Sequence, residues 1–495
     1  MVNGGVIVIM DNEYKLLNIQ NKNLKREKEE IKRQYDFLVV LQKAVFNNDI
    51  TVLDGYTYGD LYSLLANPLV GNTEAYKIMF EQIAQLNIKR IINSNDKIKA
   101  AFLPSRVEFW AFDRLYRLLE SDGRFDPRII LTRTELFDDS EDELAGIYNG
   151  FQKFFDAKGF KYMDGYDEAA NSYKPWDKLF NPDIIVHIMP HKERVPGEYW
   201  IMNMPLSVLN IYIPYGIMAA NYQQAQFNRE FHHVCWRIFC ETPFHRDLAE
   251  KYSKVGSFNV CCSGYIKMDT FFESDAEIDI SHIWKAADGA DLKNIKKIIW
   301  APHHWFGDND EEVSFATFEK NNMFMYDYAR SHSDTSWILK PHPLLKANGI
   351  RAGVFKSGSE YDDYMHKWDN LPNAKVVEKD VYFEIFKTSD AMILDSVSFL
   401  SEYLYVNKPM LRLTKPLKCN PFNEFGDIIR SALYEVPGDD FEGIADFIGN
   451  IVGGNDYLKG KREEIFDKYL NYPKRNNGLL ASDYVYEYLR DIFLL

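Results

Sequence analysis

The sequence IFKTSDAMILDSVSFLSEYLYVNKPMLRL, Ile385 to Leu413, holds a strand, a turn, a helix and a second strand in one run. The apolar residues Ala391 to Leu394 are typical of a buried parallel strand. Asp395 to Ser398 form a polar turn that can cap a helix over Phe399 to Val406, and Met410 to Leu413 predict the next strand. At such a turn, free backbone N–H groups and the positive end of the helix dipole face the same point. We therefore expect a phosphate site here, with the rest of the chain arranging substrates around it.

The size and composition of the chain indicate a folded, acidic protein of several domains. With 495 residues it is too long for one ordinary domain, so two or three are expected. Its 31 Tyr and 34 Phe supply real cores and exclude a disordered chain. The formal net charge of −15 gives no general affinity for nucleic acid or anionic lipid.

The cysteines and the hydropathy pattern predict a cytoplasmic location. The cysteines are odd in number and form no CxxC pair, which indicates buried, reduced thiols and argues against a zinc site. They are Cys235, Cys240, Cys261, Cys262 and Cys419. No apolar run reaches the roughly 18 residues of a membrane span. We expect a protein that is soluble or peripheral to the inner face of the cell membrane.

Residues 1–96 are expected to form a helical extension. Between residues 10 and 45, apolar residues recur every seven positions: Met10, Leu17, Leu24, Ile31, Leu38 and Val45. The partner positions of this heptad hold Asn21 and Lys28, which weakens the apolar seam. Two interpretations stay open: a short coiled coil that joins two copies of the chain, or a single solvated helix docked by its C-terminal half.

From residue 97 onwards, predicted strands alternate with predicted helices. The strands cover 100–104, 127–132, 160–163, 182–189, 208–214 and 260–265, then 297–302, 337–340, 374–377, 391–394 and 410–413. The helices cover 110–119, 140–157, 314–331, 382–387, 399–406, 441–450, 459–470 and 482–494. This alternation predicts an α/β fold with two doubly wound, Rossmann-like domains at 97–275 and 290–476, a linker between them and a closing helix at 477–495. Two such domains facing a cleft form the two-lobed GT-B architecture, with ligands beyond the carboxyl ends of the strands.

Four turns of the second half follow apolar strands and should point into this cleft. They are Ala301–Trp305, Lys340–Pro343, Glu378–Asp380 and Asp395–Ser398. Together they offer imidazoles, hydroxyls, a lysine and backbone amides, which suit a donor that carries a diphosphate.

Five segments resemble the CDP-glycerol glycerophosphotransferase family, the bacterial polymerases and primases of teichoic acids and related capsular polymers. They are SGYIKMD (263–269), IIWAPHHW (298–305), LKPHP (339–343), SDAMILDSVSFLSEYLYVNKPML (389–411) and NGLLASDYVYEYL (477–489). Their order and spacing match the family over roughly residues 97–495. The resemblance implies a GT-B fold and transfer of an alditol phosphate from a CDP-alditol to a growing polymer or lipid-linked acceptor, with release of CMP.

The resemblance also implies roles for individual residues. His342 matches the family's second-domain histidine at the donor phosphates, and Asp395 and Ser398 match the turn that holds the donor diphosphate. Gly264 and Asp269 match a GYxxxD turn with a structural role. The expected donor-binding set is Pro302, His303, His304, Lys340, Asp395, Ser396, Ser398 and Glu402, with His342 catalytic.

One departure concerns the base that deprotonates the acceptor. The family has a His-Gly pair in its first domain, whereas this chain has Tyr215-Gly216. A phenol with a pKa near 10 is a poor base at neutral pH unless its pKa is depressed. Tyr215 then either orients the acceptor or is replaced as the base by another group such as His191.

Metal binding is not expected from these patterns. Asp308-Asn309-Asp310 suggests a metal-binding triplet but lies in an acidic, solvated stretch. The pairs His232-His233 and His303-His304 lack a carboxylate partner at helical spacing. We expect no resident cofactor, with Mg²⁺ carried at most by the donor diphosphate.

Two other functions compete with the alditol-phosphate transferase. The first is a GT-B glycosyltransferase with a nucleotide-sugar donor. The departure at Tyr215 favours this function, because it indicates that the acceptor site in the first domain differs from that of the family. The second is a non-catalytic bilobal scaffold that forms a homo-oligomer through residues 10–45.

Overall fold

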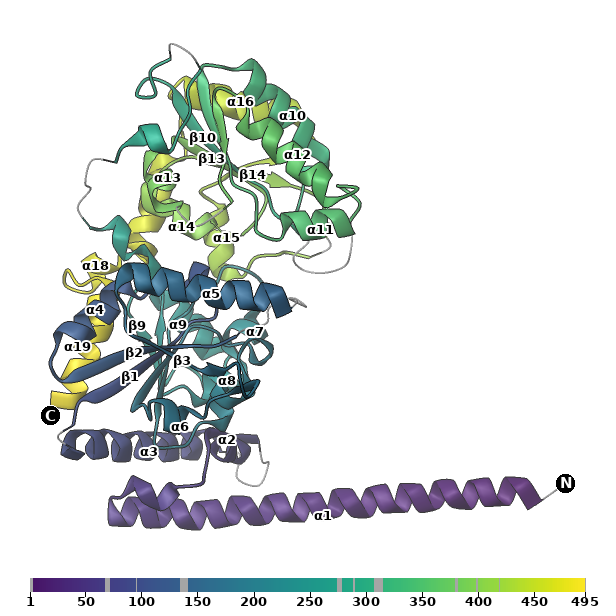
Figure 1. The fold of residues 1–495 in the computed structure, drawn as a ribbon, viewed down its shortest axis with the longest axis vertical. Helices are drawn as coiled ribbons and strands as arrows, with labels where there is room; N and C mark the ends of the chain where they lie inside the picture. The colour runs from purple at the N-terminus through teal and green to yellow at the C-terminus, as the bar shows by residue number, and fades with distance from the viewer. Residues whose placement is uncertain are drawn as a thin grey trace.

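The computed structural model describes residues 3–66, 72–94, 96–133, 141–273, 278–287, 290–306, 315–378, 382–397, 399–417 and 419–494. The side chains of residues 3–24, 108, 141–143 and 494 are not described. Two parallel sheets form two lobes, and a helical extension lies beneath the first (Figure 1). This is the predicted GT-B arrangement of two α/β lobes.

The first lobe contains a seven-stranded parallel sheet in the order β3-β2-β1-β6-β7-β8-β9. Its strands are β1 (Ile98–Leu103), β2 (Phe125–Leu131), β3 (Tyr162–Asp164), β6 (Ile184–His187), β7 (Leu209–Tyr212), β8 (Arg237–Cys240) and β9 (Val260–Cys262). Its helices are α4 (Asp113–Ser121), α5 (Glu141–Lys158), α6 (Trp176–Leu179), α7 (Gln223–Phe227), α8 (Glu230–Val234) and α9 (Pro243–Tyr252). A small hairpin pairs β4 (Tyr166–Asp167) with β5 (Ser172–Tyr173). The central strands are buried on both faces, as continuous apolar runs such as Ile184 to Val186 require.

The second lobe contains a six-stranded parallel sheet in the order β12-β11-β10-β13-β14-β15. Its strands are β10 (Lys296–Ala301), β11 (Thr335–Leu339), β12 (Ala374–Val376), β13 (Ala391–Leu394), β14 (Met410–Thr414) and β15 (Tyr434–Pro437). Its helices are α10 (Phe318–Ser331), α11 (Leu345–Arg351), α12 (Gly358–Asp369), α13 (Tyr382–Thr388), α14 (Leu400–Tyr403), α15 (Glu424–Arg430), α16 (Phe441–Val452) and α17 (Lys459–Ile465). The segment from Ile385 to Leu413 therefore contains β13, a turn, α14 and most of β14.

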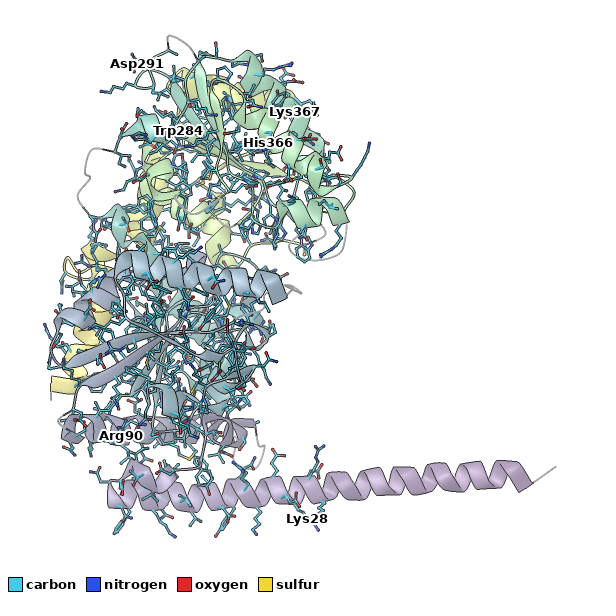
Figure 2. All side chains as sticks on the ribbon, in the orientation of Figure 1. Lys28, Arg90, Trp284, Asp291, His366 and Lys367 are labelled. Carbon is cyan, nitrogen blue, oxygen red and sulfur yellow. The ribbon has the colours of Figure 1, made fainter. Side chains whose placement is uncertain are left out.

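The extension consists of α1 (Asn3–Asn47), α2 (Tyr58–Ala66) and α3 (Thr73–Ser94). The C-terminal half of α1 is docked: Phe37, Leu41 and Ala44 are buried, while Lys28 further along the helix is exposed (Figure 2). Helix α3 is fastened to the first lobe by Arg90, whose Nη2 lies 2.8 Å from Asp183 Oδ1 (Figure 2). The docked interpretation is confirmed for the C-terminal half of α1, and the coiled coil stays a prediction.

The chain returns to the first lobe at its end through α18 (Tyr472–Arg475) and α19 (Ala481–Leu494), and α19 packs against α3 and α4. Asp269 fixes this return, because its carboxylate accepts hydrogen bonds from Tyr472 Oη at 2.6 Å and from the N–H groups of Ala481 and Ser482 at 2.9 Å. Gly264 has φ +102° and lies directly against the Tyr472 ring. The structural role expected for Gly264 and Asp269 is thus confirmed.

One expectation about local structure was wrong. The helix predicted at 110–119 begins only at Asp113, and Trp110 before it donates its indole N–H to Asp113 Oδ1 at 2.5 Å. The segment expected to link the two domains does connect the lobes, and part of it packs on the second lobe: Trp284 is buried and donates to Thr388 Oγ1 at 2.8 Å. Among the described residues, no helix is both long and apolar enough to span a bilayer.

Replacing Gly264 by alanine should destabilise the seam between the lobes. A Cβ at this position would lie 2.2 Å from Tyr472 Cγ, and φ +102° is strained for any residue with a Cβ. We expect Gly264→Ala to lower the free energy of unfolding by roughly 2–5 kcal/mol, which thermal or denaturant unfolding would measure. Gly123→Ala is the matched control, since a Cβ there meets no atom within 4 Å. Equal effects of the two substitutions would contradict the prediction.

Candidate functional site

The predicted turns of the second lobe meet because their strands are neighbours. Strands β11, β10 and β13 are adjacent and parallel, so their carboxyl ends lie at one edge of the sheet. The turn after β11 is bound to the turn after β10 through the His342 N–H, which donates to Pro302 O at 3.1 Å. Of the third predicted turn, after β12, Lys379 and Asp380 lie outside the described residues, as do Ser398 of the fourth turn and the triplet at 308–310.

Asp395, directly after β13, binds two other segments at this edge of the sheet. It is 2% exposed, and its Oδ1 accepts the His303 N–H at 2.6 Å. Its Oδ2 accepts the Thr317 N–H at 2.7 Å and the Thr317 hydroxyl at 3.0 Å. Burial raises the pKa of Asp395 to about 6 against the opposing effect of these donors, so at neutral pH an ionised carboxylate holds the turn after β10. Asp395 was expected to bind the donor, and the structure places it as a positioning residue.

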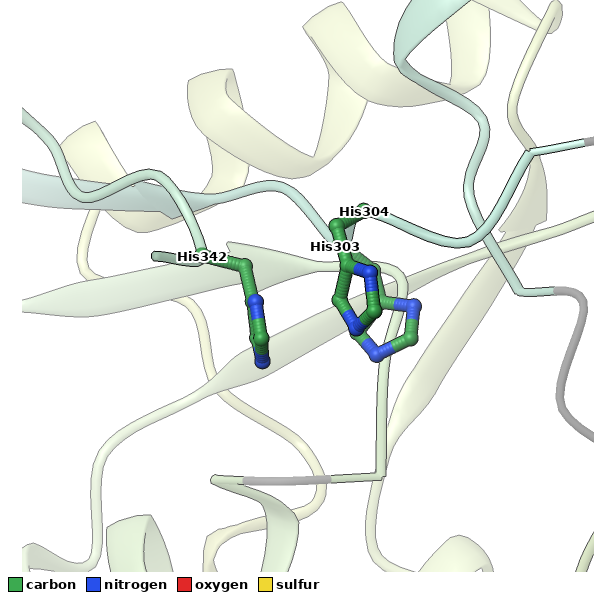
Figure 3. A group of neighbouring side chains, drawn as sticks. All are labelled: His303, His304 and His342. Carbon is green, nitrogen blue, oxygen red and sulfur yellow. The ribbon is translucent and has the colours of Figure 1, made fainter. Parts of the chain in front are cut away.

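Three histidines converge above this carboxylate. One ring nitrogen from each of His303, His304 and His342 lies within 4.8 Å of the others. The ring centroids of His304 and His342 are 4.0 Å apart, and those of His303 and His304 are 4.4 Å apart. Figure 3 shows the rings reaching one another from two neighbouring turns. Sequence analysis placed all three in the donor site, and the fold makes them one cluster.

Hydrogen bonds at Nδ1 determine which nitrogen of each ring carries the proton. His303 Nδ1 accepts the Trp305 N–H at 3.3 Å, and His342 Nδ1 accepts the Leu344 N–H at 3.1 Å. A neutral imidazole whose Nδ1 accepts must carry its hydrogen on Nε2. Both rings therefore present an Nε2–H donor.

The third ring follows the same rule. His304 Nδ1 lies 2.6 Å from Asn348 Nδ2. The orientation of that amide is fixed from its other side, because Arg351 Nη1 donates to Asn348 Oδ1 at 3.3 Å. The cluster is thus built from three N–H donors, which suit an anion. A metal ion would instead need free Nε2 lone pairs, with Nδ1–H groups donating to oxygens.

Burial and positive neighbours keep the cluster neutral. Burial, with His304 and Lys340 next, lowers the pKa of His342 to about 3. Burial alone lowers the pKa of His304 to about 4. Burial, the two other histidines and Lys415 hold the pKa of His303 well below its usual range. Lys340 and Ser396 are themselves buried at this edge. Desolvated N–H donors beside lysine charges are suited to bind an anionic group.

The helix after the turn is short. Helix α14 (Leu400–Tyr403) continues directly as a 3-10 turn at Leu404–Val406, in agreement with the helix predicted at 399–406, and so short a segment aligns few peptide dipoles. The histidine side chains, more than the helix terminus, carry the electrostatics of the site.

Tyr215, Gly216 and His191 lie on first-lobe loops that follow β7 and β6. The Tyr215 and His191 ring centroids are 6.4 Å apart. Burial raises the pKa of Tyr215 even though Arg194 and Arg229 oppose it, so the phenol keeps its proton at neutral pH. Burial followed by Arg229 and Arg194 lowers the pKa of His191 to about 4, which leaves a neutral imidazole able to accept a proton.

A short chain of contacts connects this loop to the second lobe. The Tyr265 hydroxyl donates to Tyr215 O at 2.7 Å and lies 3.3 Å from Glu402 Oε1. Further along the same loop, the Asn423 N–H donates to Ala219 O at 3.0 Å. Glu402, expected in the donor site, is buried, and burial raises its pKa against the opposing effect of Lys267. The loop at Tyr215 therefore packs on the second lobe.

A groove of about 940 Å³ opens between the lobes beside this loop. Aromatic and charged side chains of α4, of the residues before it, of the end of α5, of the turn after β9 and of α13 line it, among them Trp110, Arg114, Phe160, Lys267, Tyr382 and Phe383. Phe109, which lies between the lining residues Val107 and Trp110, has its ring centroid 5.3 Å from that of Tyr215. The volume admits an extended ligand.

Sequence reasoning missed Thr317, Asn348 and Tyr265. Thr317 and Asn348 lie next to or within helices that cover the second sheet, and no local pattern distinguishes them from solvent-facing residues. Tyr265 belongs to the GYxxxD segment, where it is the aromatic residue between Gly264 and Asp269, and it could have been singled out there.

Comparisons with known proteins add no family assignment. The sequence matches no protein-family model and no curated protein. Among solved structures, it is similar to the UDP-GlcNAc 2-epimerase from Neisseria meningitidis bound to UDP-GlcNAc, with 13% identity, TM-score 0.49, and 80% of this chain and 100% of that chain covered. A variant of the wall teichoic acid polymerase TagF has 11% identity and TM-score 0.49, with 83% and 93% covered. The UDP-GlcNAc 2-epimerase from Methanocaldococcus jannaschii has 12% identity and TM-score 0.44, with 74% and 98% covered.

Binding of a diphosphate to the histidine cluster should occur without proton uptake between pH 6 and 8. The imidazoles of His304 and His342, with pKa values lowered to about 4 and about 3, are neutral in this range. Nδ1 of each ring already accepts an N–H hydrogen bond, so a second proton has no free position on the ring. Calorimetry with CDP-glycerol in two buffers of different ionisation enthalpy should therefore give equal binding enthalpies, since both phosphates of this diester stay ionised in that range. Affinity that increases as the pH falls from 8 to 6, with proton uptake, would contradict the prediction.

Proposed function

We propose that this chain is a transferase that moves an alditol phosphate from a CDP-alditol to a hydroxyl group of a cell-surface polymer precursor and releases CMP. The observation that carries the proposal is the cluster of three Nε2–H donors on His303, His304 and His342. This cluster is built from the same segments that resemble the CDP-glycerol glycerophosphotransferase family. The resemblance supplies the cytidine and alditol parts of the donor, which the cluster alone does not specify.

The reaction requires charge neutralisation at the phosphorus that is attacked. The acceptor oxygen forms a bond to the phosphorus that carries the alditol, and the bond from that phosphorus to the bridging oxygen breaks, with its electron pair leaving on CMP. The imidazole N–H groups and the Lys340 ammonium face the oxygens on which negative charge accumulates. A divalent ion such as Mg²⁺ would in this proposal arrive with the donor diphosphate.

The acceptor proton requires a base in the first lobe. His191 is neutral and lies beside Tyr215, whereas Tyr215 keeps its own proton. We assign proton acceptance to His191 and acceptor orientation to the Tyr215 hydroxyl as a hydrogen-bond donor. The roughly 940 Å³ groove beside Tyr215 would hold the polymer or lipid-linked acceptor, with the chain acting at the inner face of the membrane.

A nucleotide-sugar transferase is the second candidate function. The observation that favours it is Tyr215, which stands where the family has its histidine. The two candidates share the diphosphate cluster and differ in the nucleotide and in the group transferred.

Removing His342 should abolish CMP release. We expect His342→Ala to lower the rate of CMP release from CDP-glycerol or CDP-ribitol by about 10²–10³-fold, because one charge-stabilising donor is lost. An assay of CMP with an oligomeric or lipid-linked acceptor measures this. His366→Ala is the matched control, since His366 is exposed on α12 (Figure 2). Turnover only with nucleotide sugars, equally reduced in His342→Ala, would establish the second candidate.

The two first-lobe residues should differ in their effect. His191→Gln should reduce the rate about 10²–10⁴-fold and remove a base-dependent limb from the pH–rate profile. Tyr215→Phe should act mainly on the KM for the acceptor, because the phenol orients and does not accept a proton. A larger loss of kcat in Tyr215→Phe than in His191→Gln would reverse the assignment.

A further inference from the structure

Two cysteines on neighbouring strands lie directly opposite one another. Strands β8 and β9 pair in parallel with Cys240 in register with Cys262, and their Sγ atoms are 3.5 Å apart. Paired residues on adjacent strands are roughly 4.8 Å apart, which is inside the range of about 4.4–6.8 Å that disulfides span between Cα atoms. The two sulfurs can therefore bond after side-chain rotation, without separating the strands.

The surroundings of the pair favour a thiolate on Cys262. The Cys240 thiol can donate to Cys262 Sγ, and that contact, with the guanidinium groups of Arg246 and Arg475, lowers the pKa of Cys262. Arg475 Nε and Nη2 are buried and, within the part of the chain that the structure describes, have no hydrogen-bond partner. A nearby negative charge stabilises a buried guanidinium most when some of its N–H groups have no other hydrogen-bond partner.

The two thiols differ in access and in charge. Cys262 is half-buried and Cys240 is buried, with its pKa raised by burial. Cys262 thus suits the first attack on a small oxidant, and Cys240 suits the second step as the resolving thiol.

We propose that Cys240 and Cys262 form a peroxide-reactive modification site that closes to an intramolecular disulfide. The Cys262 thiolate attacks one peroxide oxygen, the O–O bond breaks, and the leaving hydroxide takes a proton to become water. Cys240 then attacks the resulting sulfenic acid, forms the S–S bond and releases a second water. Two electrons from the thiols reduce one hydrogen peroxide molecule.

Cys240 and Cys262 lie next to the segment by which the chain returns to the first lobe. The Gly264 N–H donates to Cys240 O at 3.3 Å, and Asn476 Nδ2 donates to Ser263 O at 2.7 Å. Arg475 belongs to α18, the segment that returns to the first lobe. Oxidation of the Cys262 thiolate to a disulfide removes the negative charge that lies near Arg475, at the place where the chain returns to the first lobe.

The test is limited oxidation of the intact protein with hydrogen peroxide at pH 7.5, followed by alkylation and peptide mapping. We expect a Cys240–Cys262 disulfide, two hydrogens lighter than the thiol pair, to form before the exposed Cys419 is oxidised. Cys240→Ser should accumulate a sulfenic acid on Cys262 that dimedone traps, and Cys262→Ser should leave Cys240 as a thiol. Arg246→Gln should slow disulfide formation several-fold.

Cys261→Ser is the matched control, because Cys261 lies next to Cys262 on β9 and burial raises its pKa. It should leave the rate of disulfide formation unchanged. The proposal is wrong if Cys240 and Cys262 both remain alkylatable after Cys419 is fully oxidised, or if the disulfide joins other cysteines. Equal oxidation of Cys240 in Cys262→Ser would overturn the assignment of the attacking thiol.

Discussion

The position of the two lobes depends on the carboxylate of Asp269. It is 4% exposed and accepts three hydrogen bonds from the returning chain, one from the Tyr472 hydroxyl and two from the backbone at the start of α19. Burial raises its pKa, and the donors hold the charged form against that effect. A buried carboxylate deprived of such partners would be strongly destabilising, so the seam is specific as well as stable. These bonds add to the direct contacts by which Tyr265 joins the loop at Tyr215 to Glu402.

A second buried carboxylate repeats this arrangement within one lobe. Asp395 joins the turn after β10 to the start of α10, as Asp269 joins the turn after β9 to α19. In each case an aspartate at the carboxyl end of the sheet is used to hold backbone N–H groups from distant segments. The ligand-facing chemistry is then left to histidine and lysine side chains that these carboxylates position. Buried carboxylates beside the histidine cluster are thus compatible with the proposed anion site, because their oxygens accept hydrogen bonds from backbone N–H groups.

The sequence predicts the parts of the fold that depend on local apolar patterns. Strand β13 begins and ends where its apolar run does, because a buried parallel strand needs no polar face. Helix α12 was missed because polar residues fill most of its positions, and the burial of Tyr361, Tyr364 and Trp368 becomes apparent only once the second sheet is present. Helix α11 was missed because it is short and contains Asn348 and Gly349. The histidine cluster could be foreseen, since the carboxyl ends of neighbouring parallel strands meet. The tautomers of the three histidine rings could not be predicted from the sequence, because they depend on backbone N–H groups and on Asn348 from another segment.

The chain crosses between the lobes twice, once before β10 and once near Tyr472, and the two crossings have a mechanical consequence. The first is anchored on the second lobe by Trp284, and the second is anchored on the first lobe by Asp269. The loop at Tyr215 and Ala219 also contacts the second lobe, through Tyr265 and Asn423. Separation of the two lobes would therefore require the anchored crossings and these direct contacts to break together.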